Sequence, residues 1–159
     1  MAKRQIFYSF HYDNDVFRVH QIRNIGSLEE NNPVSANDWE TVKRGGDTSI
    51  KKWIDENLKN KSCLVVLIGS ETSTRKWVKY EIEKAWNDGK AVLGIYIHNL
   101  KCPRNGICNQ GANPFEAFTL GNGKSLSSIV KCYNPKSDNT YNDIAENIEN
   151  LIEEAINKR

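Results

Sequence analysis

The stretch SCLVVLIG, residues 62–69, decides the fold class, because it is an unbroken run of apolar residues between Ser62 and Gly69. Runs of this length that are rich in Val, Ile and Leu suit strands that are buried on both faces of a parallel sheet. A second such run, KAVLGIYIH, follows at residues 90–98, and a shorter β-rich run, RQIFYSF, lies at residues 4–10. The sequence therefore predicts three strands of a parallel sheet.

Helical patterns lie between and after these runs. Apolar residues recur with helical spacing in residues 47–59, 77–86 and 139–157, and a further helix is expected at residues 14–24. Asp47 is expected to cap the helix that follows it. Strands that alternate with helices through right-handed crossovers predict a doubly wound α/β fold, with a mainly parallel sheet and helices on both faces.

Two stretches do not fit regular elements, residues 25–46 and residues 99–127. The first is expected to hold a short second strand near Pro33 to Ala36. The second is too long for an ordinary connection, and loops of that length are usually functional, lid-like or disordered. No internal repeat, linker or low-complexity tract divides the sequence, so we expect one domain over residues 1–159.

Charge and hydropathy exclude several classes of partner. Lys and Arg total 22 against 20 for Asp and Glu, and the small surplus is scattered along the chain. We therefore expect no binding to nucleic acid or to a membrane surface. The start MAKRQIFYSFHY lacks a long apolar region and a small-residue cleavage site, and no other apolar stretch approaches membrane-spanning length. We expect a cytoplasmic protein.

The cysteines and the common motifs give no sign of a metal or of a familiar enzyme class. The spacing of the Cys and His residues is not that of a metal site, so no metal is expected. The motifs G-x-G-x-x-G, G-x-x-x-x-G-K-[ST] and G-x-S-x-G are absent, which removes the usual signatures of dehydrogenases, P-loop ATPases and α/β-hydrolases. The four cysteines are expected to be free thiols: Cys63, Cys102, Cys108 and Cys132.

Glu81 does not fit its surroundings. On a helical wheel of residues 77–86 it lies about 40° from Trp77, inside an apolar arc. A carboxylate held against apolar neighbours loses hydration, so its pKa is expected to rise, and such groups concentrate at functional sites. The pattern leaves an alternative open, in which the helix lies at the sheet edge and Glu81 reaches solvent or pairs with Arg75 or Lys84.

The loops that follow two of the predicted strands are expected to meet at one edge of the sheet. SFHYDND, residues 9–15, follows the first strand, and GSETSTR, residues 69–75, follows the strand at residues 62–69. In open α/β sheets, ligands bind outside the carboxyl ends of the strands. Glu81 lies in a helix that starts at that edge, so its side chain can point back toward the crevice. We therefore expect both loops and Glu81 to face one ligand.

The sequence resembles a known family over most of residues 4–116. The stretches that carry the resemblance are FYSFHYDNDVFRVHQIRN at 7–24, Trp39, SIKKWIDENLKNKSCLVVLIGSETSTRKWVKYEIEKA at 49–85, GIYIHNL at 94–100 and NPF at 113–115. The pattern LIGSxTxxRxWVxYEI within them is highly specific. These stretches resemble the TIR-like domain of bacterial Thoeris anti-phage defence proteins (ThsB). After residue 116 the resemblance is weak, so the C-terminal third inherits no functional residues.

The resemblance implies a TIR fold, related to flavodoxin-like sheets, and an enzyme that cleaves NAD and makes a cyclic ADP-ribose-type signal for a downstream effector. NAD is then the substrate, and no cofactor is implied. By this resemblance Glu81 matches the catalytic glutamate of TIR enzymes. The positions that match the strand-end lining of the nucleotide cleft are Phe7, Ser9, Phe10 and His11. Assembly into a homo-oligomer stays open.

A single carboxylate is enough for this chemistry in principle. Glycosidases ordinarily use two, because a sugar leaving group must be protonated. The nicotinamide of NAD is a cation that departs neutral, so one carboxylate near the ribose can stabilise the developing positive charge. Aromatic walls that exclude water and hold the adenine would favour a cyclic product. The candidates for these walls are Phe7, Phe10, Tyr12, Trp39 and Trp77.

Alternatives to these assignments remain. A non-catalytic TIR-like interaction module would have an exposed, ion-paired Glu81 with no pocket beside it. A phosphoacceptor domain needs an aspartate at the end of a central strand, which LVVLIGSET at residues 64–72 lacks. Ser9 and His11 could bond a ribose or a diphosphate, or could only cap the strand end. Arg18 could neutralise a phosphate or belong to a solvated helix face.

Overall fold

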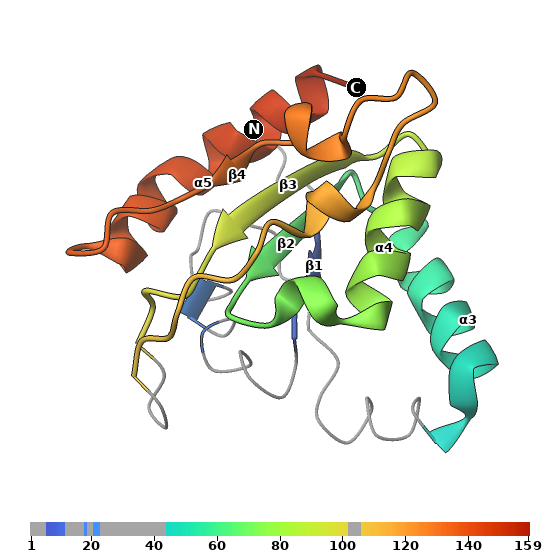
Figure 1. Cartoon of the computed structure of the whole chain (residues 1–159), viewed down its shortest axis with the longest axis horizontal. Helices are drawn as coiled ribbons and strands as arrows, with labels where there is room; N and C mark the ends of the chain where they lie inside the picture. The colour runs from blue at the N-terminus through green and yellow to red at the C-terminus, as the bar shows by residue number, and fades with distance from the viewer. Residues whose placement is uncertain (1–5, 12–17, 19–20, 23–43, 102–105) are drawn as a thin grey trace.

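A parallel sheet forms the centre of the molecule (Figure 1). The computed structural model of the chain describes residues 6–11, 18, 21–22, 44–101 and 106–159. Within these residues the sheet has four strands in the order β1-β2-β3-β4, and every neighbouring pair is parallel. The strands are β1 (Ile6–Ser9), β2 (Cys63–Ile68), β3 (Ala91–Tyr96) and β4 (Cys132–Tyr133).

The three strands predicted from apolar runs are confirmed. β2 is buried at every position, as its unbroken apolar run requires. β4 was not predicted, because a strand of two residues is too short to show a pattern. Of the helix expected at residues 14–24, the structure describes only Arg18, Gln21 and Ile22, and these three are helical. The strand expected near Pro33 to Ala36 lies outside the described residues.

The register brings the carboxyl ends of the strands to one edge of the sheet. β1 pairs with β2 from Ile6 opposite Cys63 to Ser9 opposite Val66. β2 pairs with β3 as far as Ile68 opposite Tyr96. Whatever follows the three strands therefore lies at a common edge, as expected for a parallel sheet.

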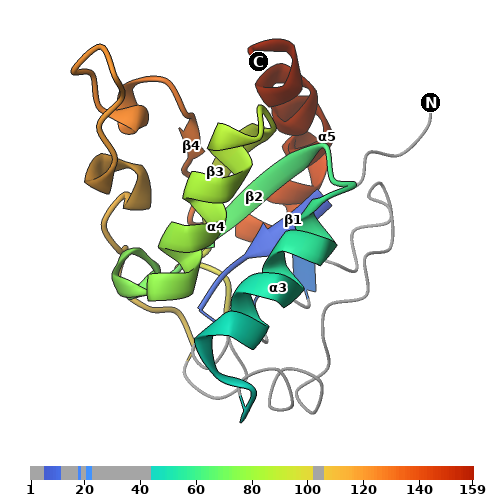
Figure 2. The same ribbon diagram turned by 90° about the vertical axis from the view of Figure 1, so that its right-hand side faces the viewer.

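Helices cover both faces of the sheet, which confirms the doubly wound α/β class. The helices are α3 (Gly46–Leu58), α4 (Lys76–Asn87) and α5 (Thr140–Asn157). Figure 2 shows α3 and α4 side by side on one face and α5 on the other. Within the described residues, no helix is long and apolar enough to cross a membrane. That residues 1–159 form a single domain stays a prediction.

The role expected for Asp47 was wrong. The helix begins one residue earlier, at Gly46, and Asp47 lies in its first turn without capping the backbone. Its carboxylate instead accepts a hydrogen bond of 2.6 Å from the Lys76 ammonium at the start of α4. This contact lowers the pKa of Asp47 and ties the first turns of the two neighbouring helices together.

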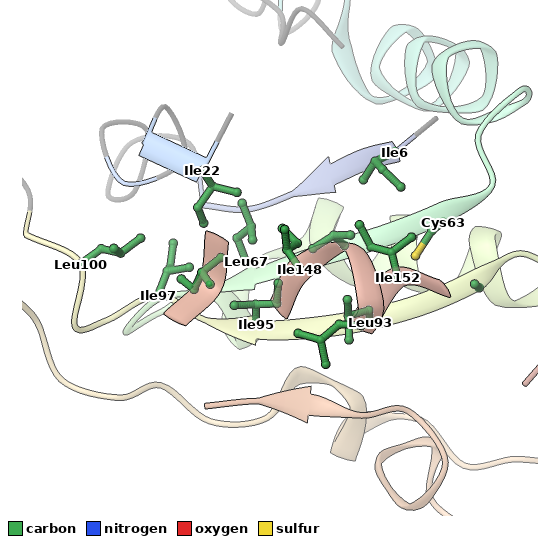
Figure 3. Close-up of a cluster of buried hydrophobic side chains, with 14 residues drawn as sticks. Ile6, Ile22, Cys63, Leu67, Leu93, Ile95, Ile97, Leu100, Ile148 and Ile152 are labelled. Atoms are coloured by element: carbon green, nitrogen blue, oxygen red, sulfur yellow. The ribbon is translucent and has the colours of Figure 1, made fainter. Parts of the chain in front are cut away.

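One half of the core lies between the sheet and α5 (Figure 3). Ile148 and Ile152 of α5 pack there against Leu67, Leu93 and other inward side chains of the strands. Ile148 is fully buried and Ile152 is 1% exposed, as the three- and four-residue spacing of α5 predicts.

The other half lies between the sheet and α3 and α4, and Phe115 is its largest fully buried side chain. β3 makes room for this ring with Gly94. A Cβ at Gly94 would lie 2.9 Å from the Phe115 ring, 2.8 Å from the Cys132 sulfur and 3.1 Å from Ile68. The glycine is therefore required by the aromatic ring that lies against the strand.

The stretch 99–127, expected as an irregular loop, carries structure of its own in its described part. It contains the short 3₁₀ helix Pro114–Ala117 and the start of a second one, Leu126–Ser128, and the two helices contact each other. Phe115 and Leu126 bury their side chains in the core. This part of the stretch is thus a packed layer of the fold.

Among the described cysteines, Cys63, Cys108 and Cys132 are free thiols, as expected, whereas Cys102 lies outside the described residues.

Candidate active site

Helix α4 holds Glu81 against the sheet. The residue is 8% exposed and lies on the buried stripe of the helix with Val78, Ile82 and Ala85. The expectation of a buried carboxyl is therefore confirmed. Pairing with Lys84 is not seen, because the Lys84 ammonium lies 3.4 Å from the Asp88 carboxylate.

Burial changes the acidity of Glu81. Loss of hydration raises the pKa of this carboxyl from its ordinary value of 4.5 to about 8. The nearby Ser9 hydroxyl offsets the rise only in part. In the absence of a ligand, the side chain is thus mostly a neutral acid at pH 7.

Ser9, the last residue of β1, lies beside Glu81. It is 1% exposed and on the same side of the strand as Phe7, which packs in the core beneath α4. The hydroxyl is close enough to lower the pKa of Glu81, yet the two groups do not align into a full hydrogen bond. Among the described residues, Ser9 Oγ and Glu81 Oε2 are buried without a hydrogen-bond partner. Buried polar atoms normally have partners, so these two atoms are suited to a ligand.

His11 joins the loop after β1 to the loop after β2. It is 8% exposed, and its Nδ1 lies 4.0 Å from a carboxylate oxygen of Glu71, whose side chain is 61% exposed. The contact is an ion pair only when the imidazole is protonated. The two loops expected to face one ligand therefore do approach each other at this edge.

The aromatic candidates do not all lie beside Glu81. Phe7 is 8% exposed and packs in the core, with its ring centroid 6.1 Å from that of Trp53. Phe10 packs against the core beneath α5, on the opposite side of the sheet from Glu81. Its predicted part in lining the cleft is not supported by this position, because successive residues of an extended chain point to opposite faces.

Trp77 lies one turn before Glu81 on α4, at the end of the helix that is nearer the carboxyl edge of the sheet. Its half-buried ring meets Tyr80 edge to face, with centroids 5.8 Å apart, and the Lys76 ammonium lies 4.8 Å from the ring centroid. Residues four apart share a face of a helix, so Trp77 lies on the same side of α4 as Glu81. Trp39 and Tyr12 lie outside the described residues.

His98 was missed by the sequence analysis. It follows β3, is 8% exposed, and its Nδ1 is buried without a hydrogen-bond partner among the described residues. Burial and the nearby Arg18 charge lower the pKa of its imidazole, so it is neutral at pH 7. The letters KAVLGIYIH place a histidine at a strand end but do not show whether its ring is buried.

Arg18 is not part of a solvated helix face. It is 2% exposed and donates to the carbonyl oxygens of Leu100, at 2.9 Å, and Gly106, at 2.7 Å. Its guanidinium therefore holds the chain after β3 in place. These contacts join residues more than eighty positions apart in the sequence, so the local sequence around Arg18 does not predict them.

Within the described part of the chain, no group of three or more His, Cys, Asp or Glu residues could hold a metal ion.

Fold and site together define an α/β protein of the TIR type, with a buried acid and buried polar groups at the carboxyl edge of a parallel sheet. The family model described as "Thoeris protein ThsB, TIR-like domain" matches residues 7–102. The chain therefore belongs to the ThsB TIR-like family, and the resemblance noted in its sequence is confirmed.

A relative from Bacillus cereus (strain MSX-D12) is named "Putative cyclic ADP-D-ribose synthase ThsB1". It is 40% identical over 121 residues, which are 73% of this chain and 62% of the relative. The chain thus spans less than two thirds of that protein's length.

Proposed function

We propose that this protein cleaves the bond between nicotinamide and ribose in NAD and forms a cyclic ADP-ribose-type product, as part of bacterial anti-phage defence. The observation that carries the proposal is the buried carboxyl of Glu81 beside the unpartnered hydroxyl of Ser9. Membership of the ThsB family and the name of the Bacillus cereus relative support the reaction class.

In this proposal Glu81 stabilises the positive charge that develops on the ribose as neutral nicotinamide leaves. The cationic nicotinamide ring, once bound, favours the ionised carboxylate and so lowers the pKa of Glu81 from about 8. Opposite charges ~4 Å apart interact by about 4 kcal/mol at an effective dielectric of about 20. Each ~1.4 kcal/mol corresponds to a tenfold change in rate, so this contact could supply a large acceleration.

The neighbouring polar groups are assigned to the rest of the nucleotide. Ser9 Oγ, which is close enough to affect the pKa of Glu81, would bond a ribose hydroxyl. His11, supported in its protonated form by Glu71, would bond the diphosphate. Trp77, one turn before Glu81 on α4, would exclude water so that the molecule's own adenine traps the ribosyl cation. The product would reach an effector as a diffusible nucleotide.

The test compares wild type with Glu81→Gln and Glu83→Gln after addition of NAD. Glu83 is exposed on the same helix, so its variant is a matched control for the loss of one negative charge. We expect Glu81→Gln to lose at least about a hundredfold in nicotinamide release, and Glu83→Gln to keep the wild-type rate. Equal rates in all three proteins would remove Glu81 from the reaction.

A second experiment tests the case in which the enzyme is inactive until the cell is infected. Small molecules are extracted from cells that carry each of the three genes, before and after phage challenge, and analysed by mass spectrometry. A cyclic ADP-ribose-type species should appear after challenge with wild type and Glu83→Gln only. The alternative of a non-catalytic interaction module predicts an exposed, ion-paired Glu81 with no pocket beside it, whereas Glu81 is 8% exposed.

A further inference from the structure

Residues 107–118, here called the crossing segment, lie across the carboxyl ends of β2 and β3 (Figure 1). The segment is tied to β3 near its start, where the Cys108 N–H donates to the carbonyl oxygen of His98 at 2.9 Å. It lies beyond residues 7–102, which the family model matches. Of its residues, only NPF at 113–115 is among the stretches that carry the family resemblance.

The far end of the crossing segment is fixed in the core. The Asn113 side chain accepts a hydrogen bond of 2.9 Å from the Phe115 N–H and so caps the 3₁₀ helix Pro114–Ala117. The Phe115 ring is fully buried against Gly94 of β3. With both ends held, the residues between them have a set path over the strand ends.

On that path Gly111 is packed against the loop that follows β2. A Cβ on Gly111 would overlap the carbonyl oxygen of Gly69 and would lie 3.0 Å from that of Ser70. Both neighbours are backbone atoms, which cannot rotate away as a side chain can. The crossing segment can take this path only because residue 111 has no side chain.

The loop that Gly111 contacts leads directly into α4. The Gly69 N–H donates to Thr72 Oγ1 at 2.8 Å, which closes the first turn of this loop. Three residues after Thr72 the chain reaches the N-cap of α4, the helix that carries Glu81. A displacement of Gly69 would therefore move this short, hydrogen-bonded turn and, with it, the start of α4. Helix α4 is the element that buries Glu81 beside Ser9.

We propose that Gly111 is a positioning residue for Glu81, because the crossing segment presses on the β2–α4 loop and keeps the carboxyl sealed against the sheet. The catalytic part of this inference rests on the proposed function, whereas the structural part does not. The inference assigns a role to a segment that lies outside the family-matched residues.

The test uses Gly111→Ala with Gly121→Ala as the matched control. Gly121 lies on the same long connection, has no atom within 4 Å of an added Cβ and needs no positive φ. In Gly111→Ala, we expect kcat for nicotinamide release to fall by about 10- to 100-fold with a smaller change in KM, since small misplacements of a reacting group have effects of this size. Gly121→Ala should keep both constants.

A second measurement separates this inference from the proposed function. Titration of the Glu81 carboxyl by ¹³C NMR, assigned by its absence in Glu81→Gln, should show its pKa drop by at least about one unit in Gly111→Ala, as water reaches the site. If wild type releases no nicotinamide but this drop is seen, the reaction assignment fails and the positioning role stands. An unchanged pKa in Gly111→Ala overturns the positioning role.

If Gly111→Ala does not fold, Asn113→Ala decides the question. This variant removes the cap on the 3₁₀ helix and loosens the crossing segment without adding atoms. A lowered pKa of Glu81 in folded Asn113→Ala supports the inference, and a wild-type pKa in that variant overturns it.

Discussion

Glu81 is kept out of water by the same helix that brings it to the sheet. Val78, Ile82 and Ala85 bury one side of α4, and Glu81 is buried with them because it lies within their arc. An ionised carboxylate in such a place destabilises the folded protein unless a ligand compensates. Folding alone therefore gives no reason for an ionisable residue at this position, and we propose that ligand binding does.

This cost has a defined pH dependence. Between pH 4.5 and about 8 the folded protein holds a proton on Glu81 that the unfolded chain has released. The unfolded state then binds fewer protons, so the free energy of unfolding falls as pH rises. Glu81→Gln removes this slope. We expect the stability of the variant relative to wild type to increase by on the order of 4 kcal/mol from pH 4 to pH 9.

The measurement is urea denaturation of Glu81→Gln, Glu83→Gln and wild type across that pH range. Effects of other ionisable groups cancel in the difference between each variant and wild type. The exposed Glu83 should give a flat difference. A flat difference for Glu81→Gln as well would show that its carboxyl is hydrated in solution.

At the scale of elements, β3 depends on the absence of a side chain at its centre. Gly94→Ala would place a methyl group within about 3 Å of the Phe115 ring and of the Cys132 sulfur. Overpacking of this kind costs about 1–3 kcal/mol of unfolding free energy. Urea denaturation of Gly94→Ala should show this loss, and Gly121→Ala should not. Unchanged stability would mean that Phe115 can repack at no cost.

The elements that could be predicted are those with a long local pattern. β2 and β3 follow from apolar runs, and α5 follows from its spacing of apolar residues. β4 and the short 3₁₀ helices have two to four residues each, which is too few for a period. Asp47 fits the composition of an N-cap, but its carboxylate pairs with Lys76 on the next helix, a contact that local sequence does not encode.

The candidate site divides in the same way. Glu81 could be found because one acidic residue interrupts an apolar arc, and Ser9 and His11 because they follow a strand. The burial of His98 and the close packing of Gly111 could not be found, since both depend on what other segments place against these residues. Phe10 was assigned to the cleft lining by the family resemblance, and in the structure it packs against the core on the other face of the sheet.

At the scale of the whole molecule, helices cover both faces of the sheet (Figure 2), and the site that we propose for the ligand lies at the carboxyl edge of the sheet. In this proposal, a nucleotide bound there would contact the loops that follow β1 and β2 together with α4. These elements unfold with the core, so binding should stabilise the entire fold.

Glu81→Gln provides the test, because a protein that binds NAD without cleaving it can be held at saturation. With NAD at about 100 times its Kd, the free energy of unfolding should rise by about 2.7 kcal/mol. Thermal unfolding of this variant with increasing NAD measures the effect, and adenosine, which lacks the diphosphate and the nicotinamide riboside, is the control. If millimolar NAD leaves the melting temperature unchanged, binding at this edge is contradicted.

The position of the crossing segment outside residues 7–102 also bears on how such proteins diverge. Two relatives can keep the same sheet and the same acid while their chains differ in how tightly this later segment lies over the strand ends. Selection can then adjust turnover without touching the reacting group. Among relatives, we expect rates to vary with the length and glycine content of this segment more than with changes inside the sheet.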